Sequence, residues 1–168
     1  MAEPNRHDRL QPSLLDRLTD DLPEQRREAL DRQVLTMQQL RAAVLRDLAW
    51  LLNTTNLAAT DDLDDTPLAA ASTVNYGVPG FTGTVVSTER VSSLEQRIAD
   101  AIRQFEPRIR PGSVRVRARA AQEDQHARLV FEIQGELWAQ PVPQQLFLET
   151  SVDVATRLAV VTDMRARS

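Results

Sequence analysis

The feature that most constrains the fold is a change of periodicity across the stretch FEPRIRPG, residues 105–112. Before it, over residues 94–105, apolar side chains recur every three or four positions, which is the period of an amphipathic helix. After it, apolar residues from Val114 onward alternate with arginines, which is the period of a half-buried strand. Pro107 stops the helix because proline lacks an N–H and its ring clashes with the preceding turn. The sequence therefore predicts a helix that ends near Glu106 and leads directly into a strand.

Two helices are expected on the N-terminal side of this junction. Ser92 and Glu95 have the spacing of a capping box, so the helix before the junction is expected to begin at Ser92. Between residues 24 and 53, a stripe of apolar residues predicts a longer helix, most apolar toward its C-terminal end and with Trp50 in the core. The polar first half of this helix is expected to be solvated or to face a partner.

The arginine-rich segment is expected to be the first strand of a small sheet. Apolar residues alternate again in RLVFEIQGELWAQP, and a hairpin with the first segment is the natural pairing. If Val116 and Phe131 face the core, Glu132 and the arginines share the outer face, where opposite charges pair across strands. The segment QQLFLETSVDV predicts a third strand. The expected fold class is α+β, with N-terminal helices and then an amphipathic helix packed on a small three-stranded, mainly antiparallel sheet.

A chain of 168 residues is long enough for one domain with an extension. We expect an N-terminal arm with short helices over residues 1–38, where Ser13 and Asp16 have the spacing of a helix start. The α+β domain is expected over residues 39–158, and a C-terminal tail over residues 159–168.

The residue types that are missing exclude several kinds of chemistry. Without cysteine there is no disulfide, no thiolate nucleophile and no cysteine-bound metal. The two histidines, His7 and His126, fall in the N-terminal segment and in the hairpin turn, which argues against a serine–histidine triad. The acidic run at residues 61–65 lacks the glycine and the distal glutamate of a calcium loop, so a solvated loop is favoured. We expect no cofactor and no metal.

The charge distribution argues against a nucleic-acid ligand. The net charge is −4, and the outward arginines have no aromatic residues interleaved with them to stack on bases. These arginines are therefore expected to meet carboxylates of their own hairpin or of another protein. The N-terminus has no apolar stretch of signal-peptide type, and no apolar run approaches the ~18 residues of a membrane span. The expected location is the cytoplasm, without membrane insertion.

Glu106 has three competing interpretations: a helix-stop residue, half of a catalytic carboxylate pair, or part of a docking plug. Catalysis of glycosidase type requires a sugar groove, yet aromatics are only 4% of the chain and Trp138 and Tyr76 are the only stacking platforms left. Arg108 would stabilise the ionised carboxylate, whereas a general acid has to hold a proton. The sequence therefore favours a rigid, oppositely charged plug at a helix-to-strand corner.

Four stretches together resemble a known family. VLRDLAWLLNT, STVNYGVPGFTG, IADAIRQFEPRI and FEIQGELWAQP are similar, in order and spacing, to the TssE family of bacterial type VI secretion baseplates. That family is similar in turn to small wedge proteins of contractile phage tails that are historically labelled lysozyme-like. The similarity covers residues 13–155 and implies a structural role without established hydrolase activity. A wedge protein of a phage or phage-like tail remains the nearest alternative, and a peptidoglycan hydrolase is a more distant one.

The resemblance also implies partners and contact residues. Members join a cytoplasmic wedge complex with TssF, TssG and TssK around the hub and spike, assembled at the inner face of the cell envelope. Their sheet resembles the strand-exchange domain of the sheath subunits, so the first ring of TssB and TssC adds strands to it and sheath polymerisation starts there. To the residues that match the two family motifs we add the outward arginines of the first strand. The expected partner-binding residues are Glu106, Pro107, Arg108, Asn75, Tyr76, Gly77, Pro79, Arg115, Arg117 and Arg119.

Overall fold

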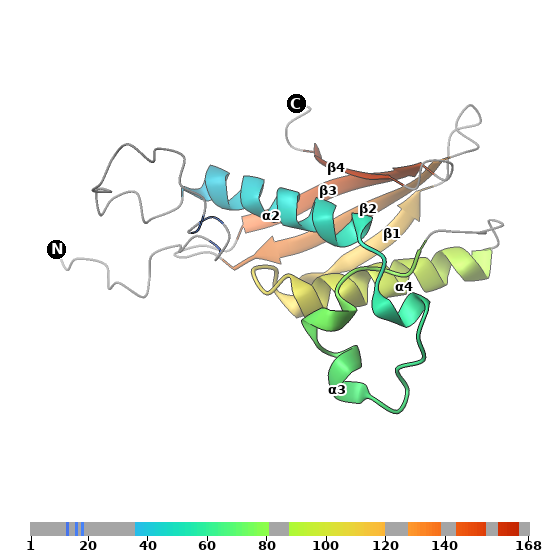
Figure 1. The fold of residues 1–168 in the computed structure, drawn as a ribbon. Helices are drawn as coiled ribbons and strands as arrows, with labels where there is room; N and C mark the ends of the chain where they lie inside the picture. The colour runs from blue at the N-terminus through green and yellow to red at the C-terminus, as the bar shows by residue number, and fades with distance from the viewer. Residues whose placement is uncertain are drawn as a thin grey trace.

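Two long helices lie on one face of a four-stranded antiparallel sheet (Figure 1). The computed structural model describes residues 13, 16, 18, 36–80, 88–119, 128–138, 144–153 and 158–164. The helices are α2 (Met37–Asn53), α3 (Pro67–Ala70) and α4 (Thr88–Phe105), with short 3-10 turns η3 (Leu57–Ala59), η4 (Thr73–Asn75) and η5 (Pro111–Ser113). The strands are β1 (Arg115–Arg119), β2 (Arg128–Leu137), β3 (Gln144–Asp153) and β4 (Ala159–Asp163), in that order across the sheet.

Helix α2 corresponds to the apolar half of the longer predicted helix. It begins after Thr36, whose hydroxyl accepts a hydrogen bond from the Gln39 N–H while the Gln39 side chain accepts one from the Thr36 N–H. Such a reciprocal cap satisfies donors that the first turn leaves open. The predicted residues before Thr36 lie outside the described part of the chain. The placement of Trp50 in the core was wrong, because the residue is 49% exposed while its neighbours Leu51 and Leu52 are buried.

Helix α4 ends where the sequence predicts but begins earlier. It runs from Thr88 to Phe105, so the expected capping box starting at Ser92 was wrong and Ser92 lies in its second turn. The carboxylate of Glu95 has a different role: its Oε1 accepts a hydrogen bond of 2.6 Å from the Ala118 N–H on β1. This contact ties the helix to the border of the sheet.

The sheet confirms the α+β class, with four strands where the sequence predicts three. In β1 and β2, Val116 lies opposite Ile133 and Ala118 opposite Phe131, and the two β2 side chains are fully buried beneath the helices. The fourth strand was not predicted: its five residues, 159–163, lie in the segment that the sequence suggests is a C-terminal tail. Its pairing with β3 extends the sheet through residues 159–163.

Both ends of α2 are fastened to β4. At the N-terminal end, the Arg41 guanidinium forms an ion pair with the Asp163 carboxylate, and both side chains are largely shielded from solvent. At the C-terminal end, the Asn53 amide donates to the Ala159 carbonyl and its oxygen accepts from the Ala159 N–H, each at 2.9 Å. The last described strand is thus held by the first long helix.

Residues 54–80, which follow α2, form a lobe of short helical turns that projects from the domain (Figure 1). Asn75 holds the lobe together, because its Oδ1 accepts from the Ala58 N–H at 2.9 Å and its Nδ2 donates to the Ala70 carbonyl at 3.0 Å. The four aspartates of residues 61–65 are exposed on it.

Candidate functional site

The Glu-Pro-Arg corner, residues 106–108, contains a buried ion pair between Glu106 and Arg108. Glu106 follows the last residue of α4, and its side chain turns inward, where the residue is 3% exposed. One of its oxygens, Oε1, accepts from the Arg108 backbone N–H at 3.1 Å and from Arg108 Nε at 2.7 Å. The other, Oε2, accepts from Arg108 Nη2. Both carboxylate oxygens are therefore occupied by the residue two positions further along the chain.

A second carboxylate, that of Asp47 on α2, also forms an ion pair with Arg108. Arg108 Nη2 also donates to Asp47 Oδ2, and Asp47 Oδ1 accepts from Arg46 Nε at 2.8 Å. Arg46 in turn forms an ion pair with Asp16. The five side chains therefore alternate in sign from the α4 corner to the N-terminal segment, where Ser13 Oγ accepts from the Asp16 N–H as the predicted helix start requires.

The electrostatics of this alternating cluster favour the charged forms. Burial opposes the charge of Arg108, but hydrogen bonds and charges from Glu106 and Asp47 outweigh it and raise the pKa of the guanidinium above its ordinary value. Hydrogen bonds to Asp16 and Asp47 raise the pKa of Arg46 in the same way. The Arg46 guanidinium holds the pKa of the Asp16 carboxyl below its ordinary value, against a smaller opposing effect of burial. The shifts for Arg108, Arg46 and Asp16 all favour the charged form of the group.

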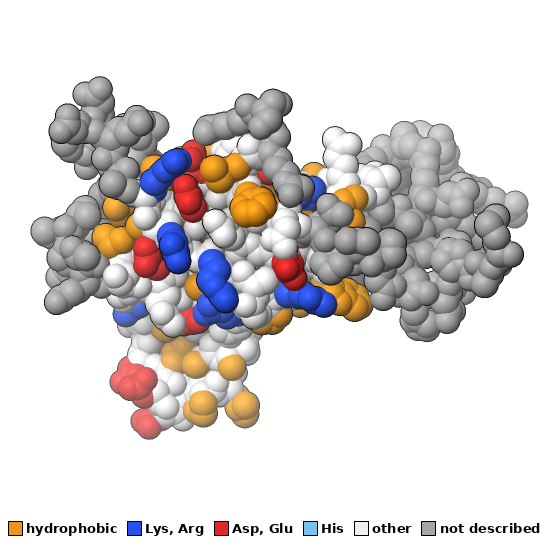
Figure 2. Space-filling model, turned by 180° about the vertical axis from the view of Figure 1, so that it is seen from behind, with side chains coloured by type: hydrophobic (Ala, Val, Ile, Leu, Met, Phe, Trp, Pro, Cys, Tyr) orange, Lys and Arg blue, Asp and Glu red, His pale blue; other side chains and the backbone are white. Residues whose placement is uncertain are grey.

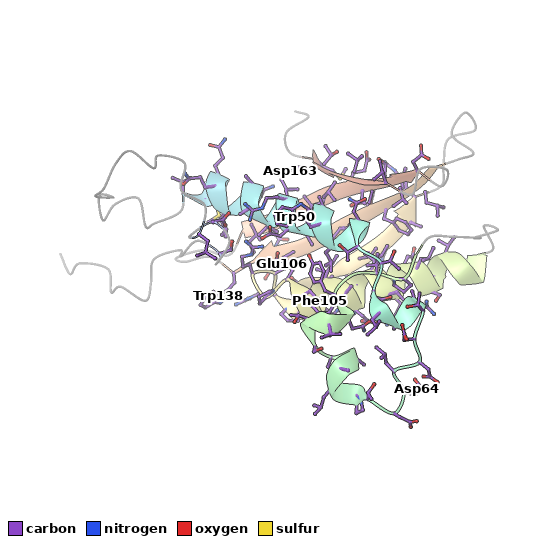
Figure 3. The ribbon with its side chains drawn as sticks, in the orientation of Figure 1. Trp50, Asp64, Phe105, Glu106, Trp138 and Asp163 are labelled. Atoms are coloured by element: carbon purple, nitrogen blue, oxygen red, sulfur yellow. The ribbon has the colours of Figure 1, made fainter. Side chains whose placement is uncertain are left out.

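The backbone of residues 108–110 is also fixed, by hydrogen bonds to the end of β2. The Trp138 N–H donates to the Arg108 carbonyl at 2.7 Å, and the Arg110 N–H donates to the Glu136 carbonyl at 2.9 Å. Between these two bonds, Ile109 is 1% exposed and sits in the core. Figure 3 shows Glu106 and Trp138 in this part of the domain, well away from Asp64 on the projecting lobe. The exposed Pro107 therefore lies on a turn that is fixed on both sides.

The charged-plug interpretation needs one revision. Glu106 lies inside the fold and not at the surface, so its side chain is not available for direct contact with another protein. The corner is oppositely charged, as expected, but the charges face each other within the protein. What it presents outward is the Pro107 ring and the indole of Trp138, whose residue is 60% exposed.

The second family motif, which comprises Asn75, Tyr76, Gly77 and Pro79, meets the Glu-Pro-Arg corner through Tyr76. The ring of Tyr76 packs edge-on against Phe105, with centroids 5.2 Å apart, and its hydroxyl donates to the Asp47 carbonyl at 3.4 Å. Burial raises the pKa of the Tyr76 hydroxyl, and the nearby Asp47 and Glu106 carboxylates raise it further. Tyr76 is therefore the residue of this motif that lies against the Glu-Pro-Arg corner.

The other three residues of the second motif lie at a groove beside α4. Asn75, Gly77 and Pro79 line a groove of about 770 Å³. Arg97 and Gln104 of α4 line the same groove. Gly77 has a φ of 125°, a conformation that side chains with a Cβ rarely adopt, which lets the chain pass directly against the end of α2. The motif thus supports the local backbone as well as the groove.

The three predicted arginines of β1 lie on the opposite face of the sheet, as the alternation predicts. Arg117 is paired in register with Glu132, and Arg119 forms ion pairs of 3.4 Å with Glu132 and 3.5 Å with Glu149. Arg115 instead donates to main-chain carbonyls near its own strand end. Figure 2 shows this face, where basic and acidic side chains are interleaved. The arginine face and the Glu-Pro-Arg corner are separate surfaces.

The surface ion pairs of Arg119 are expected to add little to stability. Its side chain is 58% exposed, and exposed pairs typically contribute less than about 1 kcal/mol. We therefore expect Arg119→Ala to lower the free energy of unfolding by less than about 1 kcal/mol in urea titrations at neutral pH. A loss above about 2 kcal/mol would show that these pairs act as a structural network.

The sequence analysis did not identify Asp47, which lies on α2 and forms an ion pair with Arg108. A signal was present, because Asp47 lies three residues after Val44 and one before Leu48, at the border of the buried stripe. A carboxylate at such a position is rarely tolerated without a partner. The sequence does not show that the partner lies 61 positions away.

The sequence matches a known protein family. Residues 38–142, more than half of the chain, match the family described as baseplate wedge protein gp25. A search of curated proteins found no match. No helix in the described part of the chain is long and apolar enough to cross a lipid bilayer. The family contains TssE, so the resemblance found in the sequence is confirmed. The chain belongs to the gp25 family of baseplate wedge proteins, which are components of phage and phage-like contractile tails.

Proposed function

We propose that this chain is the TssE-type wedge subunit of a type VI secretion baseplate. In this role it joins TssF, TssG and TssK around the hub and spike, in the cytoplasm at the inner face of the cell envelope. It also starts the polymerisation of the sheath from TssB and TssC. Its contribution is structural, because it offers preformed surfaces and performs no reaction.

The observation that carries this proposal is the rigid corner at residues 106–108. Three hydrogen bonds from Arg108 hold the Glu106 carboxylate, and Asp47 holds Arg108 from a second helix. Because the turn is fixed before any partner arrives, little conformational freedom is lost when Pro107 and its surroundings are buried. A preorganised contact of this kind suits a permanent structural joint.

The same corner argues against a peptidoglycan hydrolase. A general acid has to reach the glycosidic oxygen, yet Glu106 is 3% exposed and both of its oxygens accept hydrogen bonds from Arg108. A proton held there would have to break the ion pair that fixes the corner. We therefore propose that Glu106 is a positioning residue for the assembly surface and not a catalyst.

Trp138 is the residue we expect to anchor the wedge contact. Its backbone N–H bonds to the Arg108 carbonyl, so its position follows the corner, while the residue is 60% exposed. Aromatic side chains at the centre of interfaces commonly contribute 2 kcal/mol or more to binding, which corresponds to about 30-fold in Kd. We expect Trp138→Ala to weaken binding to a purified TssF–TssG complex by at least about tenfold, measured by calorimetric titration.

The matched control is Leu68→Ala on the projecting lobe. Leu68 is 87% exposed, so both substitutions remove an exposed apolar side chain and neither disturbs the core. We expect the control to bind like the unmodified chain. Equal binding of Trp138→Ala and the unmodified chain would contradict the wedge surface that we propose around Trp138. If the unmodified chain fails to bind TssF–TssG, a wedge role in a phage or phage-like tail becomes the better assignment.

A further inference from the structure

The two borders of the sheet differ in how their backbone groups are satisfied. At the β1 border, the Ala118 N–H donates to Glu95 Oε1 on α4, and the Val114 carbonyl accepts from Arg103 Nη2 at 3.3 Å. Outward arginines on the same strand add charge, which is one way natural proteins protect an edge from pairing. The β1 border is therefore already occupied by side chains of α4.

The β4 border is open beyond its first residue. The Asp153 N–H donates to the Leu158 carbonyl, so the antiparallel alternation directs the N–H and C=O of Ala159 and Val161 away from β3. The Asn53 amide holds both groups of Ala159. Within the described residues, neither backbone group of Val161 has a partner on that side. An added strand would find its first open pairing position there.

The side chains at this border also lack the usual protection. Leu158 and Val160 are each 59% exposed, and no residue of β4 is basic or proline. The acid of the strand, Asp163, is turned toward Arg41 on α2 and does not charge the edge. A strand laid against β4 would cover the Val160 side chain, whereas a strand against β1 would meet arginines.

We propose that β4, and not β1, is the edge that accepts a strand of the sheath subunit. This inference rests on the proposed function, which supplies the sheath as partner. The Asn53 side-chain amide donates to the Ala159 carbonyl and accepts from the Ala159 N–H, as a neighbouring strand would. A strand added to β4 therefore cannot pair with Ala159. The occupant is an extended segment that pairs from Val161 onward and places an apolar side chain beside Val160.

Two proline substitutions distinguish the borders. Val161→Pro removes the outward N–H of β4 and places a ring where the added strand would lie, while leaving the N–H groups that bond to β3. Val116→Pro does the same on β1, since Val116 shares the outward direction of Ala118. Both valines are half-buried and pack on the core, so the two changes carry a similar cost to the fold. Thermal unfolding of both variants checks that this cost is matched.

We expect Val161→Pro to weaken binding of purified TssB–TssC at least tenfold and Val116→Pro to leave it nearly unchanged. Both variants should bind TssF–TssG like the unmodified chain. Hydrogen exchange on the unmodified chain gives an independent measurement that needs no variant to fold. On adding TssB–TssC, the Val161 amide should become protected, while amides of β1 keep their rates.

Each other result overturns the inference in a distinct way. Weakening by Val116→Pro alone, or protection of β1 alone, assigns the sheath to the other edge. Full binding by both variants without protection of Val161 rules out strand addition at β4 but leaves the wedge role standing. If the unmodified chain does not bind TssB–TssC, the sheath part of the proposed function fails as well. Concentration-dependent protection of Val161 without sheath would make a second copy of this chain the occupant.

Discussion

Replacing Arg108 by methionine is expected to lower the free energy of unfolding by about 3 to 5 kcal/mol. The methionine keeps much of the apolar stem but leaves the Glu106 carboxylate, whose side chain is 4% exposed, without its cation. Breaking a buried pair by removing one member costs more than the pair itself contributes, because the remaining charge stays desolvated. Urea titration at neutral pH should show a midpoint lower by more than about 1 M.

The double variant Glu106→Leu, Arg108→Met separates the ion pair from general damage at this position. Removing both charges together leaves no unpaired carboxylate at residue 106, so most of the lost stability should return. Arg119→Ala serves as the exposed comparison. If Arg108→Met costs less than about 1 kcal/mol, the pair behaves like a surface pair and does not brace the corner.

Gly77→Ala is expected to destabilise the protein by more than about 2 kcal/mol. A Cβ at this position would lie 2.3 Å from the Thr54 carbonyl oxygen and 2.9 Å from its carbon, and the φ of 125° disfavours any side chain. The backbone cannot move aside cheaply, because the Val78 N–H donates to that same Thr54 oxygen at 2.9 Å. Thermal and urea unfolding measure the loss.

Gly112→Ala is the matched control for this substitution. Gly112 lies in η5, where a Cβ would meet nothing within 4 Å. We expect its free energy of unfolding to stay within about 0.5 kcal/mol of that of the unmodified chain. Similar losses for the two glycines would mean that the close passage of the chain at Gly77 is not what makes glycine necessary there.

The parts of the fold set by local rules could be predicted from the sequence. Pro107 ends α4 because the obstruction is local, and the arginines of β1 face outward because alternation is a property of the strand itself. The pairing of β1 with β2 followed from the same alternation. These predictions needed no knowledge of what lies far away in the chain.

The parts set by distant contacts could not be predicted. Glu95 has the spacing of a capping residue, but β1 uses its carboxylate instead. β4 is too short for its alternation to stand out, and it forms because β3 and α2 provide partners. For the candidate site, the motif residues were identified, but the Asp47 contact that makes the corner rigid depends on how α2 packs.

The attachment of α2 to β4 has a consequence for how the protein is made. Arg41 and Asp163 are 122 positions apart, and Asn53 and Ala159 are 106 apart. Contacts of such long sequence separation form slowly, because a large loop has to close before they stabilise anything. On a ribosome, α2 therefore emerges long before the strand that fastens it. We expect the helix and the first three strands to wait as an incomplete domain until the last described strand arrives.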